Sequence, residues 1–200
     1  MDSSNSNSQA GMPLRSALSV LANARQAEGV VITNQGSSRV WPLIAQHPLD
    51  FHLNPSTMGG AIPFGVGIAL AQPQREVIVL TGDGSLLMSM GSLVTVMAAG
   101  CNNLTIVLLD NNIYDVTGGQ KTAASDLKND YHGLARSVGF PTVDSFNDLA
   151  GWTEGVTRFL QSQGPRFAWL QVDPALADDM KTIQEPMDEQ LSRIGHELGC

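Results

Sequence analysis

The sequence predicts an α/β fold, in which an open and mostly parallel sheet carries helices on both faces. Apolar runs of strand length alternate with stretches whose apolar residues recur at helical spacing, in units of about 25 residues. Parallel strands joined by right-handed crossovers are the usual result of such alternation. The 200 residues include 20 glycines and 10 prolines, a composition typical of one ordinary globular domain.

The first helix is expected over residues 13–27. Leu14, Leu18 and Leu21 are spaced by four and three residues, so they share one helical face. Residues 30–32 (Val-Val-Ile) follow as a short buried strand.

Shorter elements are expected up to residue 71. Residues 33–38 are interpreted as a turn of small hydrogen-bonding residues, residues 40–44 as a short helix and residues 51–53 as a short strand. A loop follows at residues 54–60. Residues 61–71 are small and apolar almost all round, which indicates a buried helix packed closely against its neighbours.

Two strands and the helix between them form the centre of the chain. Residues 77–80 and 104–109 are apolar runs of strand length. Residues 85–99 are expected to form one helix that ends at Gly100, since glycine readily adopts the left-handed conformation that closes helices. Residues 111–127 are polar, lack periodicity and are expected to be loop.

The last third of the chain continues the alternation. We expect a short helix at residues 129–138, a strand stub at 142–143, a helix at 146–160 and a last strand at 167–172.

The chain is expected to be one domain, residues 13–174, with two extensions. Residues 1–12, rich in Ser and Asn, are expected to be a disordered tail, and they do not form a secretory signal. Residues 175–200 are expected to be a helical extension whose helix starts at Pro186. The expected apolar face of that helix consists of Met187, Leu191, Ile194 and Leu198.

Charge and cysteine content exclude several classes of protein. The net charge is −8 and no run of Lys or Arg exists, so we expect no nucleic-acid partner. Cys101 and Cys200 form no CxxC pair, which argues against zinc ribbons and iron–sulfur clusters. No apolar run has the length of a membrane span. We expect a cytoplasmic protein.

Gly82, Asp83 and Gly84 stand where the strand at 77–80 gives way to the helix from Ser85. Glycine lets a ligand approach the backbone, and a helix N-terminus favours phosphate. Because Asp83 would repel phosphate, a cation such as Mg²⁺ is expected between the two. Taken alone, the same three residues could be only a tight turn.

Asn111 offers a neutral side-chain oxygen at the end of the next strand. Between Gly84 and Asn111 lie 26 residues, the length of a helix and a strand. Carboxyl ends of parallel strands meet at one edge of a sheet, so residues 33–38, 82–85 and 111–114 should lie together. The alternative, that residues 111–112 are merely a polar loop, does not account for this spacing.

Gly82-Asp83-Gly84, the 26-residue interval and Asn111 resemble the thiamine diphosphate motif of thiamine-dependent enzymes. The resemblance extends over roughly residues 28–172 and corresponds to their diphosphate-binding domain. It implies that Mg²⁺ is bound by Asp83, the Asn111 side chain and the carbonyl of Ile113.

Two further loops resemble the same family. Met58, before an apolar helix, matches the bulky residue that holds the cofactor bent, although it could also be an ordinary core methionine. Residues 36–38 resemble the first diphosphate loop, although their hydroxyls could also cap a helix. The cofactor-binding residues that the resemblance implies are Ser37, Ser38, Ser56, Met58, Gly59, Gly82, Asp83, Gly84, Ser85, Asn111, Ile113 and Tyr114.

Residues 110–120 and 47–59 are most similar to the β subunits of sulfopyruvate decarboxylase and the matching half of phosphonopyruvate decarboxylase. This similarity implies decarboxylation of a small 2-oxoacid, with the chemistry carried by the cofactor. Asn112 and Asp115 stand where these relatives tend to have Gly. Asn tolerates a left-handed backbone. Asp115 adds a negative charge that disfavours a dianionic substrate.

The family resemblance also implies a partner subunit. Thiamine-dependent enzymes need an activating glutamate from a pyrimidine-binding domain, and the chain has no room for that domain. Glu28, Glu76 and Glu154 lie at element ends and are expected at the surface. No catalytic residue is therefore assigned to this chain. A pyrimidine-binding subunit is expected to cover an apolar surface around residues 59–64 and 111–127.

Two other functions stay open at this point. The chain could be the β subunit of a 2-oxoacid:ferredoxin oxidoreductase, although it lacks cysteine clusters. It could also be a thiamine diphosphate-binding regulatory subunit without catalytic activity.

Overall fold

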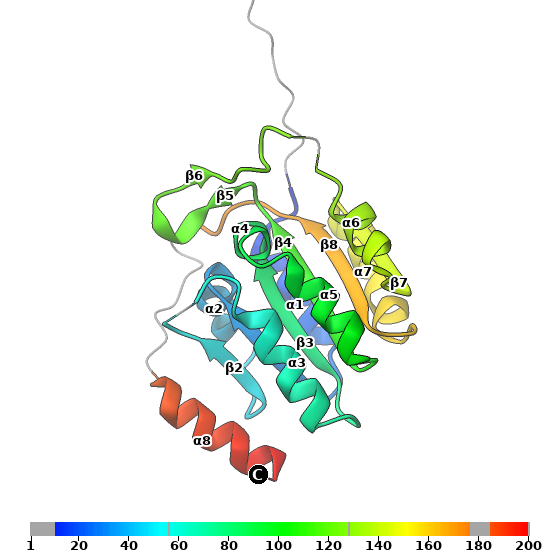
Figure 1. Ribbon diagram of the computed structural model, residues 1–200. Helices are drawn as coiled ribbons and strands as arrows, with labels where there is room; N and C mark the ends of the chain where they lie inside the picture. Colours follow the sequence, from blue (N-terminus) through cyan, green and yellow to red (C-terminus); the bar gives the residue numbers. More distant parts are fainter. Residues whose placement is uncertain (1–10, 56, 128, 177–184, 200) are drawn as a thin grey trace, which may run out of the picture.

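The computed structural model describes residues 11–55, 57–127, 129–176 and 185–199. Its centre is a six-stranded sheet of order β2-β1-β3-β4-β8-β7 in which every neighbouring pair is parallel, so the predicted α/β fold is confirmed (Figure 1). The strands are β1 (Val30–Asn34), β2 (Asp50–Leu53), β3 (Val77–Gly82), β4 (Leu104–Asp110), β7 (Thr142–Phe146) and β8 (Arg166–Gln171).

Helices cover both faces of the sheet. Alternate strand residues point to opposite faces, so Val79 packs in one apolar core and Ile78 in the other. The core that contains Ile78 also contains residues of α1 (Leu14–Ala24) and α7 (Leu149–Leu160). The core that contains Val79 also takes in residues of the other long helices. These are α3 (Ala61–Ala71), α5 (Gly91–Ala99), α6 (Tyr131–Val138) and α8 (Met187–Leu198).

The helix expected over residues 85–99 is two helices. It consists of α4 (Asp83–Leu87) and α5, separated by a turn at residues 88–90. Leu86 and Leu93 are both fully buried, so the apolar pattern continues across the break and could not reveal it. Gly100 has φ 66° and ends α5, as predicted.

The turn expected at residues 33–38 is partly helical. Strand β1 continues to Asn34, and α2 (Gly36–Val40) follows, with a short 3₁₀ turn at Trp41–Leu43. Serines at the start of α2 bond to neighbouring backbone carbonyls, which explains why their composition resembles that of a turn.

Two boundaries in the second half also differ from expectation. Strand β7 includes Phe146, and α7 begins only after Asp148, whose Oδ1 accepts a hydrogen bond from Gly151 N at 2.8 Å. The loop at 111–127 holds a small antiparallel ribbon of β5 (Ile113–Tyr114) and β6 (Gln120–Lys121).

Helix α8 covers the outer edge of the sheet along β2. The Gln190 side chain accepts a hydrogen bond from His52 N at 2.7 Å, and Arg193 donates to the Asp50 carbonyl at 3.0 Å. Leu191, expected on the apolar face, is 45% exposed, while Gln190 is fully buried. The prediction was wrong there because the edge of a strand presents backbone groups that need hydrogen bonds.

The expected terminal extensions lie partly outside the described residues, namely residues 1–10 and 177–184. Met12, expected in the tail, is only 2% exposed and forms a parallel bridge with Val172. Its amide donates to the carbonyl of Gln171 at 2.9 Å. The expected boundary at residue 12 is therefore wrong, because Met12 already belongs to the fold.

Glu76, expected at the surface, is buried. Its Oε1 accepts a hydrogen bond from Arg166 at 3.2 Å, and burial raises the pKa of its carboxyl although Arg166 opposes the shift. Glu28 and Glu154 are exposed, as predicted. In the described ranges, no helix has the length and hydropathy needed to cross a membrane.

Candidate functional site

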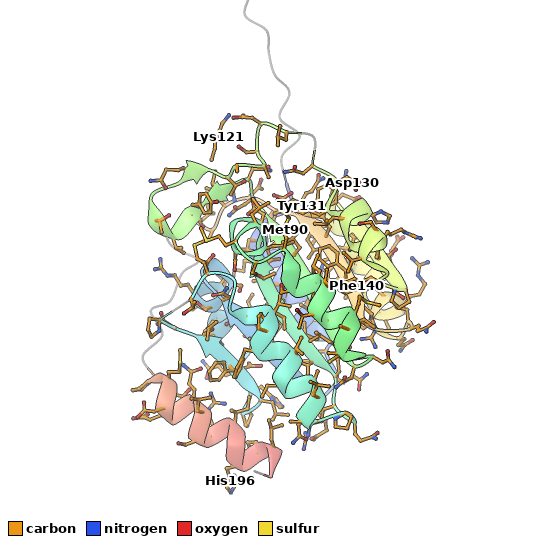
Figure 2. All side chains as sticks on the ribbon, in the orientation of Figure 1. Met90, Lys121, Asp130, Tyr131, Phe140 and His196 are labelled. Atoms are coloured by element: carbon orange, nitrogen blue, oxygen red, sulfur yellow. The ribbon has the colours of Figure 1, made fainter. Side chains whose placement is uncertain are left out.

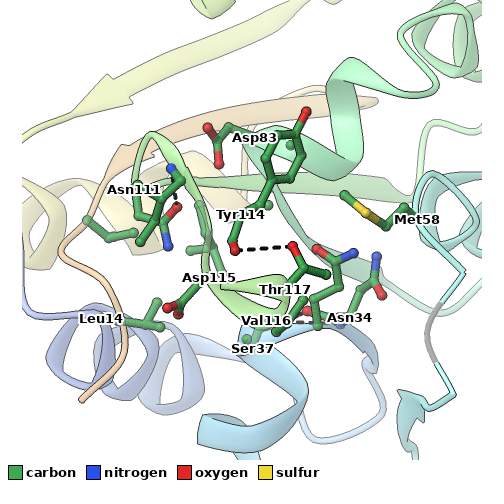
Figure 3. Close-up of a pocket in the computed structure, with 17 residues that line it drawn as sticks. Leu14, Asn34, Ser37, Met58, Asp83, Asn111, Tyr114, Asp115, Val116 and Thr117 are labelled. Atoms are coloured by element: carbon green, nitrogen blue, oxygen red, sulfur yellow. Dashed lines mark hydrogen bonds between the residues drawn. The ribbon is translucent and has the colours of Figure 1, made fainter. Parts of the chain in front are cut away.

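The carboxyl ends of β1, β3 and β4 border a cleft of about 540 Å³, counted out to its open mouth (Figure 3). The cleft lies where the strand order reverses, between β1 and β3, which is the usual ligand position in such sheets. Its lining comes mainly from the three segments that were expected to meet. The lining residues are Leu14, Asn34, Gln35, Gly36, Ser37, Met58, Gly82, Asp83, Gly84, Leu109, Asn111, Ile113, Tyr114, Asp115, Val116, Thr117 and Val172.

Asp83 is a buried carboxyl at the base of this cleft. It is 1% exposed, and its Oδ2 accepts a hydrogen bond from the Thr122 hydroxyl at 3.0 Å. Burial, and then the charge of Asp110, raise the pKa of Asp83 to about 6. Burial raises the pKa of Asp110 as well, although Trp169 Nε1 donates to its Oδ2 at 2.9 Å. Two buried carboxyls without a lysine or arginine in the lining are an environment that favours a cation.

Asn111 and Ile113 border the same cleft. Asn111 Oδ1 accepts a hydrogen bond from Ile113 N at 3.1 Å, which fixes the turn after β4. Asn112 within this turn has φ 62°, the left-handed conformation that its residue type tolerates. The three residues expected to bind a metal therefore line one cleft, and their oxygen atoms are of the kind that Mg²⁺ prefers.

Tyr114 lies over the start of α4 because Gly84 has no side chain. Ring atoms of Tyr114 are 2.5 and 2.7 Å from the position that a Cβ on Gly84 would take. Any larger residue at position 84 would displace the ring. The Gly-Asp-Gly sequence thus brings β5 onto α4 and places Tyr114 beside Asp83 in the lining.

Ser85, expected to bind the cofactor, is not part of the lining. Its hydroxyl oxygen accepts hydrogen bonds from Gly59 N at 2.9 Å and Asn34 Nδ2 at 3.1 Å. Ser85 is 1% exposed. Through these two bonds the Ser85 hydroxyl connects the end of β1, the loop after β2 and the start of α4. It therefore supports the cleft without lining it.

The hydroxyls of Ser37 and Ser38 are also used inside the chain. Ser37 Oγ donates to the Asn34 carbonyl at 2.8 Å, and Ser38 Oγ donates to the Gln35 carbonyl at 2.6 Å. Only Ser37 lines the cleft. The alternative role as a side-chain cap is absent too, since Gln35 is the residue at the N-cap of α2 and makes no capping bond.

Met58 points into the cleft (Figure 3). It belongs to neither apolar core, so it is not an ordinary core methionine. Gly59 has φ 82° and packs against Ser89, but does not line the cleft. Ser56 lies outside the described residues.

The histidines and Tyr131 are not part of this site. His52 is bonded through Nδ1 to the Thr33 hydroxyl at 2.8 Å, and burial lowers its pKa. Tyr131 is buried behind Asp110, where burial raises the pKa of its phenol, and its ring packs edge-on against Trp169.

Several cleft residues were not among the cofactor-binding residues implied by the resemblance. Asn34, Gln35, Val116 and Thr117 line the cleft, and Thr122 holds the Asp83 carboxylate. For Gln35, the position directly after a buried strand was a usable signal, because strand ends carry sites in such folds. No sequence signal points to Thr122.

Comparisons with known proteins agree with this geometry. The family model described as "Thiamine pyrophosphate enzyme, C-terminal TPP binding domain" matches residues 35–168. A solved structure of a protein from Mycobacterium smegmatis, described as a thiamin diphosphate-dependent enzyme, superimposes with TM-score 0.70 over 82% of this chain and 32% of its own, at 21% identity. At that identity the likeness supports the fold alone.

Two relatives are similar over most of the chain. The sulfopyruvate decarboxylase subunit beta of Methanothermobacter thermautotrophicus is 42% identical over 170 residues, 84% of this chain and 86% of the relative. The phosphonopyruvate decarboxylase of Streptomyces viridochromogenes is 34% identical over 161 residues, 80% of this chain. The match spans only 40% of that second, longer protein.

Proposed function

The chain belongs to the thiamine pyrophosphate enzymes, and from that membership we propose that it is the thiamine diphosphate- and Mg²⁺-binding subunit of a 2-oxoacid decarboxylase. The names of its relatives point to a small 2-oxoacid such as sulfopyruvate or phosphonopyruvate. When bound, the cofactor would supply a nucleophilic carbon and a positively charged thiazolium ring that can take up the electron pair left by departing CO₂.

The residues of the cleft fit Mg²⁺ and a diphosphate. Asp83 supplies a carboxylate, Asn111 a side-chain oxygen and Ile113 a backbone carbonyl, all from one cleft. Burial and, after it, the charge of Asp110 raise the pKa of Asp83 to about 6, and a divalent cation there would offset both effects. This buried acid pair is the single observation that best supports the proposal.

The other cleft residues would position the cofactor. Gly82 would leave the backbone open to the diphosphate, while Gly84 makes room for the ring of Tyr114 beside it. Met58 would hold the cofactor bent from the opposite wall. Asp115, also in the lining, places a carboxylate where a dianionic substrate would be repelled, so it bears directly on which 2-oxoacid is accepted.

A partner subunit would complete the active site. Among the described lining residues none is a glutamate, so the activating carboxyl would come from a pyrimidine-binding subunit. Met88 and Met90 in the turn after α4 are 58% and 44% exposed, and Leu127 in the loop before α6 is 67% exposed. Met90 is labelled in Figure 2. The partner subunit would cover these three side chains. It would not cover residues 61–64, where Ala61 and Ile62 are already buried within the chain.

Calorimetry of the chain with thiamine diphosphate, with and without Mg²⁺, tests the site. We expect binding that requires Mg²⁺ and is abolished in Asp83→Ala, while circular dichroism shows that the variant stays folded. Asp126→Ala, at an exposed acid paired only with Lys121, serves as the matched control and should bind normally. Unchanged affinity in Asp83→Ala would contradict the assignment.

Activity distinguishes decarboxylation from the two other functions. Co-expressed with a pyrimidine-binding subunit, the chain should release CO₂ from a three-carbon 2-oxoacid and leave an aldehyde. Release that depends on an electron acceptor would favour the oxidoreductase instead. Tight cofactor binding without turnover of any 2-oxoacid would favour a regulatory subunit.

A further inference from the structure

Gln35 has a backbone conformation that its residue type disfavours. Its φ is 55°, a positive value that among the described non-glycine residues is shared only with Asn112. Asparagine tolerates positive φ, but glutamine adopts it only against a steric penalty. Strain of this kind persists where the surrounding structure enforces it, and it is concentrated at functional sites.

Two serines enforce the conformation around Gln35. Ser38 Oγ donates to the Gln35 carbonyl at 2.6 Å, and Ser37 Oγ donates to the Asn34 carbonyl at 2.8 Å while accepting from Asn34 N at 3.0 Å. Both hydroxyl protons are therefore used to hold the turn. Gln35, in the middle of this turn, lines the cleft.

The side chain of Gln35 extends into the cleft without a partner. Its Oε1 lies 3.8 Å from the position that a Cβ on Gly82 would take, so the carboxamide sits beside the Gly-Asp-Gly backbone. Within the described part of the chain the carboxamide makes no hydrogen bond. It is free to bond a ligand there.

The chemistry of the cleft indicates what the carboxamide binds. Asp83 and Asp115 are its charged lining residues, and no lysine, arginine or histidine is among the described ones. One divalent cation neutralises only part of a diphosphate, so the remaining phosphate oxygens need neutral donors. A carboxamide carries two N–H donors and can rotate to present either end.

We propose that the Gln35 carboxamide binds phosphate oxygens of the diphosphate, and that Ser37 and Ser38 are positioning residues that hold Gln35 in its strained conformation. This assignment rests on the proposed function, because it assumes that the cleft takes a diphosphate. It also gives the two serines a role other than the direct phosphate contact that their sequence suggests.

Two substitutions at residue 35 separate binding from strain. Gln35→Ala removes the carboxamide and keeps a side chain at positive φ, whereas Gln35→Gly removes both. Calorimetry is done with Mg²⁺ and either inorganic diphosphate or thiamine diphosphate. The affinity of both variants should fall by up to about tenfold. Without ligand, the glycine variant should melt about 2–4 °C above the alanine variant.

Gln161→Ala is the matched control, since it removes an exposed glutamine carboxamide outside the lining. Its affinity should stay within about twofold of the parent chain. A purely structural role for Gln35 predicts instead that affinity and melting temperature fall together in both variants, which would overturn the proposal.

The outcomes also separate this proposal from the proposed function. If the parent chain binds and Gln35→Ala binds equally well, the carboxamide contact is wrong and the cofactor site stands. If the glycine variant melts no higher than the alanine variant, the strain argument is wrong. If the parent chain binds neither diphosphate compound with Mg²⁺, the proposed function fails and the Gln35 assignment fails with it.

Discussion

Asp83 and Asp110 place two carboxyl groups in a region almost closed to water, at the ends of neighbouring strands. Each is 5% exposed or less, and the pKa of each is raised chiefly by burial. Without a cation, the folded chain therefore binds protons at this pair more readily than the unfolded chain does. The acid pair makes the metal-free fold less stable at neutral pH in return for a strong attraction for a cation.

The stability of the metal-free chain should depend on pH through Asp83. Its folded pKa of about 6 exceeds the ordinary value of 3.8, so the free energy of unfolding rises as the pH falls from above 6 towards 3.8. Asp83→Asn should remove much of that slope and stabilise the chain at pH 7 by up to about 2–3 kcal/mol. Urea unfolding in a chelator at several pH values measures both.

The same experiment has a clear contrary outcome. Asp110 and Glu76 also have raised pKa values, so the stability of the variant still depends on pH. The quantity to compare is therefore the slope of unfolding free energy against pH in the variant and in the parent. Equal slopes in the two would mean that Asp83 is already paired or solvated in the metal-free chain.

Thr122 should matter for the cofactor although it does not line the cleft. Thr122→Val keeps the shape but removes the hydrogen bond to Asp83 Oδ2. We expect about tenfold weaker Mg²⁺-dependent binding, because the carboxylate loses its orientation, with about 1 kcal/mol of lost stability. Calorimetry and urea unfolding measure the two effects.

Ser125→Ala is the control for Thr122→Val, since it breaks the hydrogen bond from Ser125 to the Thr122 carbonyl in the same loop and leaves Asp83 untouched. Equal losses of affinity in both variants would mean that the loop, rather than the bond to Asp83, supports binding.

At the scale of single residues, prediction from the sequence succeeded where the number of residues between two strand ends determines which side chains meet. Asp83 and Asn111 follow strands at a fixed interval, and a parallel sheet brings strand ends together, so their convergence could be predicted. Thr122 could not be assigned in that way, and the strand end that places Gln35 at the cleft does not reveal its strained conformation. Their roles depend on a loop path and on one positive φ, neither of which leaves a periodic pattern.

Helix α3 shows how closely one element must approach the sheet for the cleft to form. A Cβ on Gly65 would lie 2.4 Å from Val79 Cγ2, so glycine sets the distance between α3 and β3. A Cβ on Gly67, two residues along, would meet nothing within 4 Å. The two glycines of one helix therefore face opposite environments.

The pair Gly65→Ala and Gly67→Ala should have effects of opposite sign. Gly65→Ala should destabilise the chain by about 1–3 kcal/mol, because the methyl group overpacks the contact with Val79. Gly67→Ala should stabilise it by about 0.5–1 kcal/mol, since alanine favours the helix and nothing opposes it. Urea unfolding of both variants measures the difference, and two destabilised variants would contradict this account.

Most elements could be predicted because their periodicity is local. Residues 61–71 were expected as a helix and form α3 with the same bounds. The break between α4 and α5 could not be predicted, because Leu86 and Leu93 are buried on both sides of it and the turn between them contains no proline or glycine. Packing against the sheet, rather than local propensity, decides that the helix stops there.

At the scale of the whole molecule, one group of exposed apolar side chains directly follows α4. Met88, Met90 and Val94 are between 44% and 58% exposed along the turn and helix that follow α4. Because they lie close together in the chain and follow the helix that begins at Asp83, we expect a partner subunit to dock on them.

Replacing Met88 and Met90 by lysine should weaken assembly but not folding. The residues are exposed, so the melting temperature should stay close to that of the parent, while the affinity for a co-expressed pyrimidine-binding subunit should fall at least about tenfold. Size-exclusion chromatography and thermal melts measure the two. Leu191→Lys, exposed on α8, is the control, and assembly of the methionine variant like the parent would place the interface elsewhere.

Helix α8 has a consequence for the behaviour of the chain during expression. By bonding to His52 and Asp50 through Gln190 and Arg193, it occupies backbone groups at an edge of the sheet where another polypeptide could otherwise add as an extra strand. The helix therefore blocks the strand pairing along β2 through which copies of the chain could associate into fibrils. A truncation made before residue 185 would keep all six strands of the sheet but expose β2, and should yield insoluble protein.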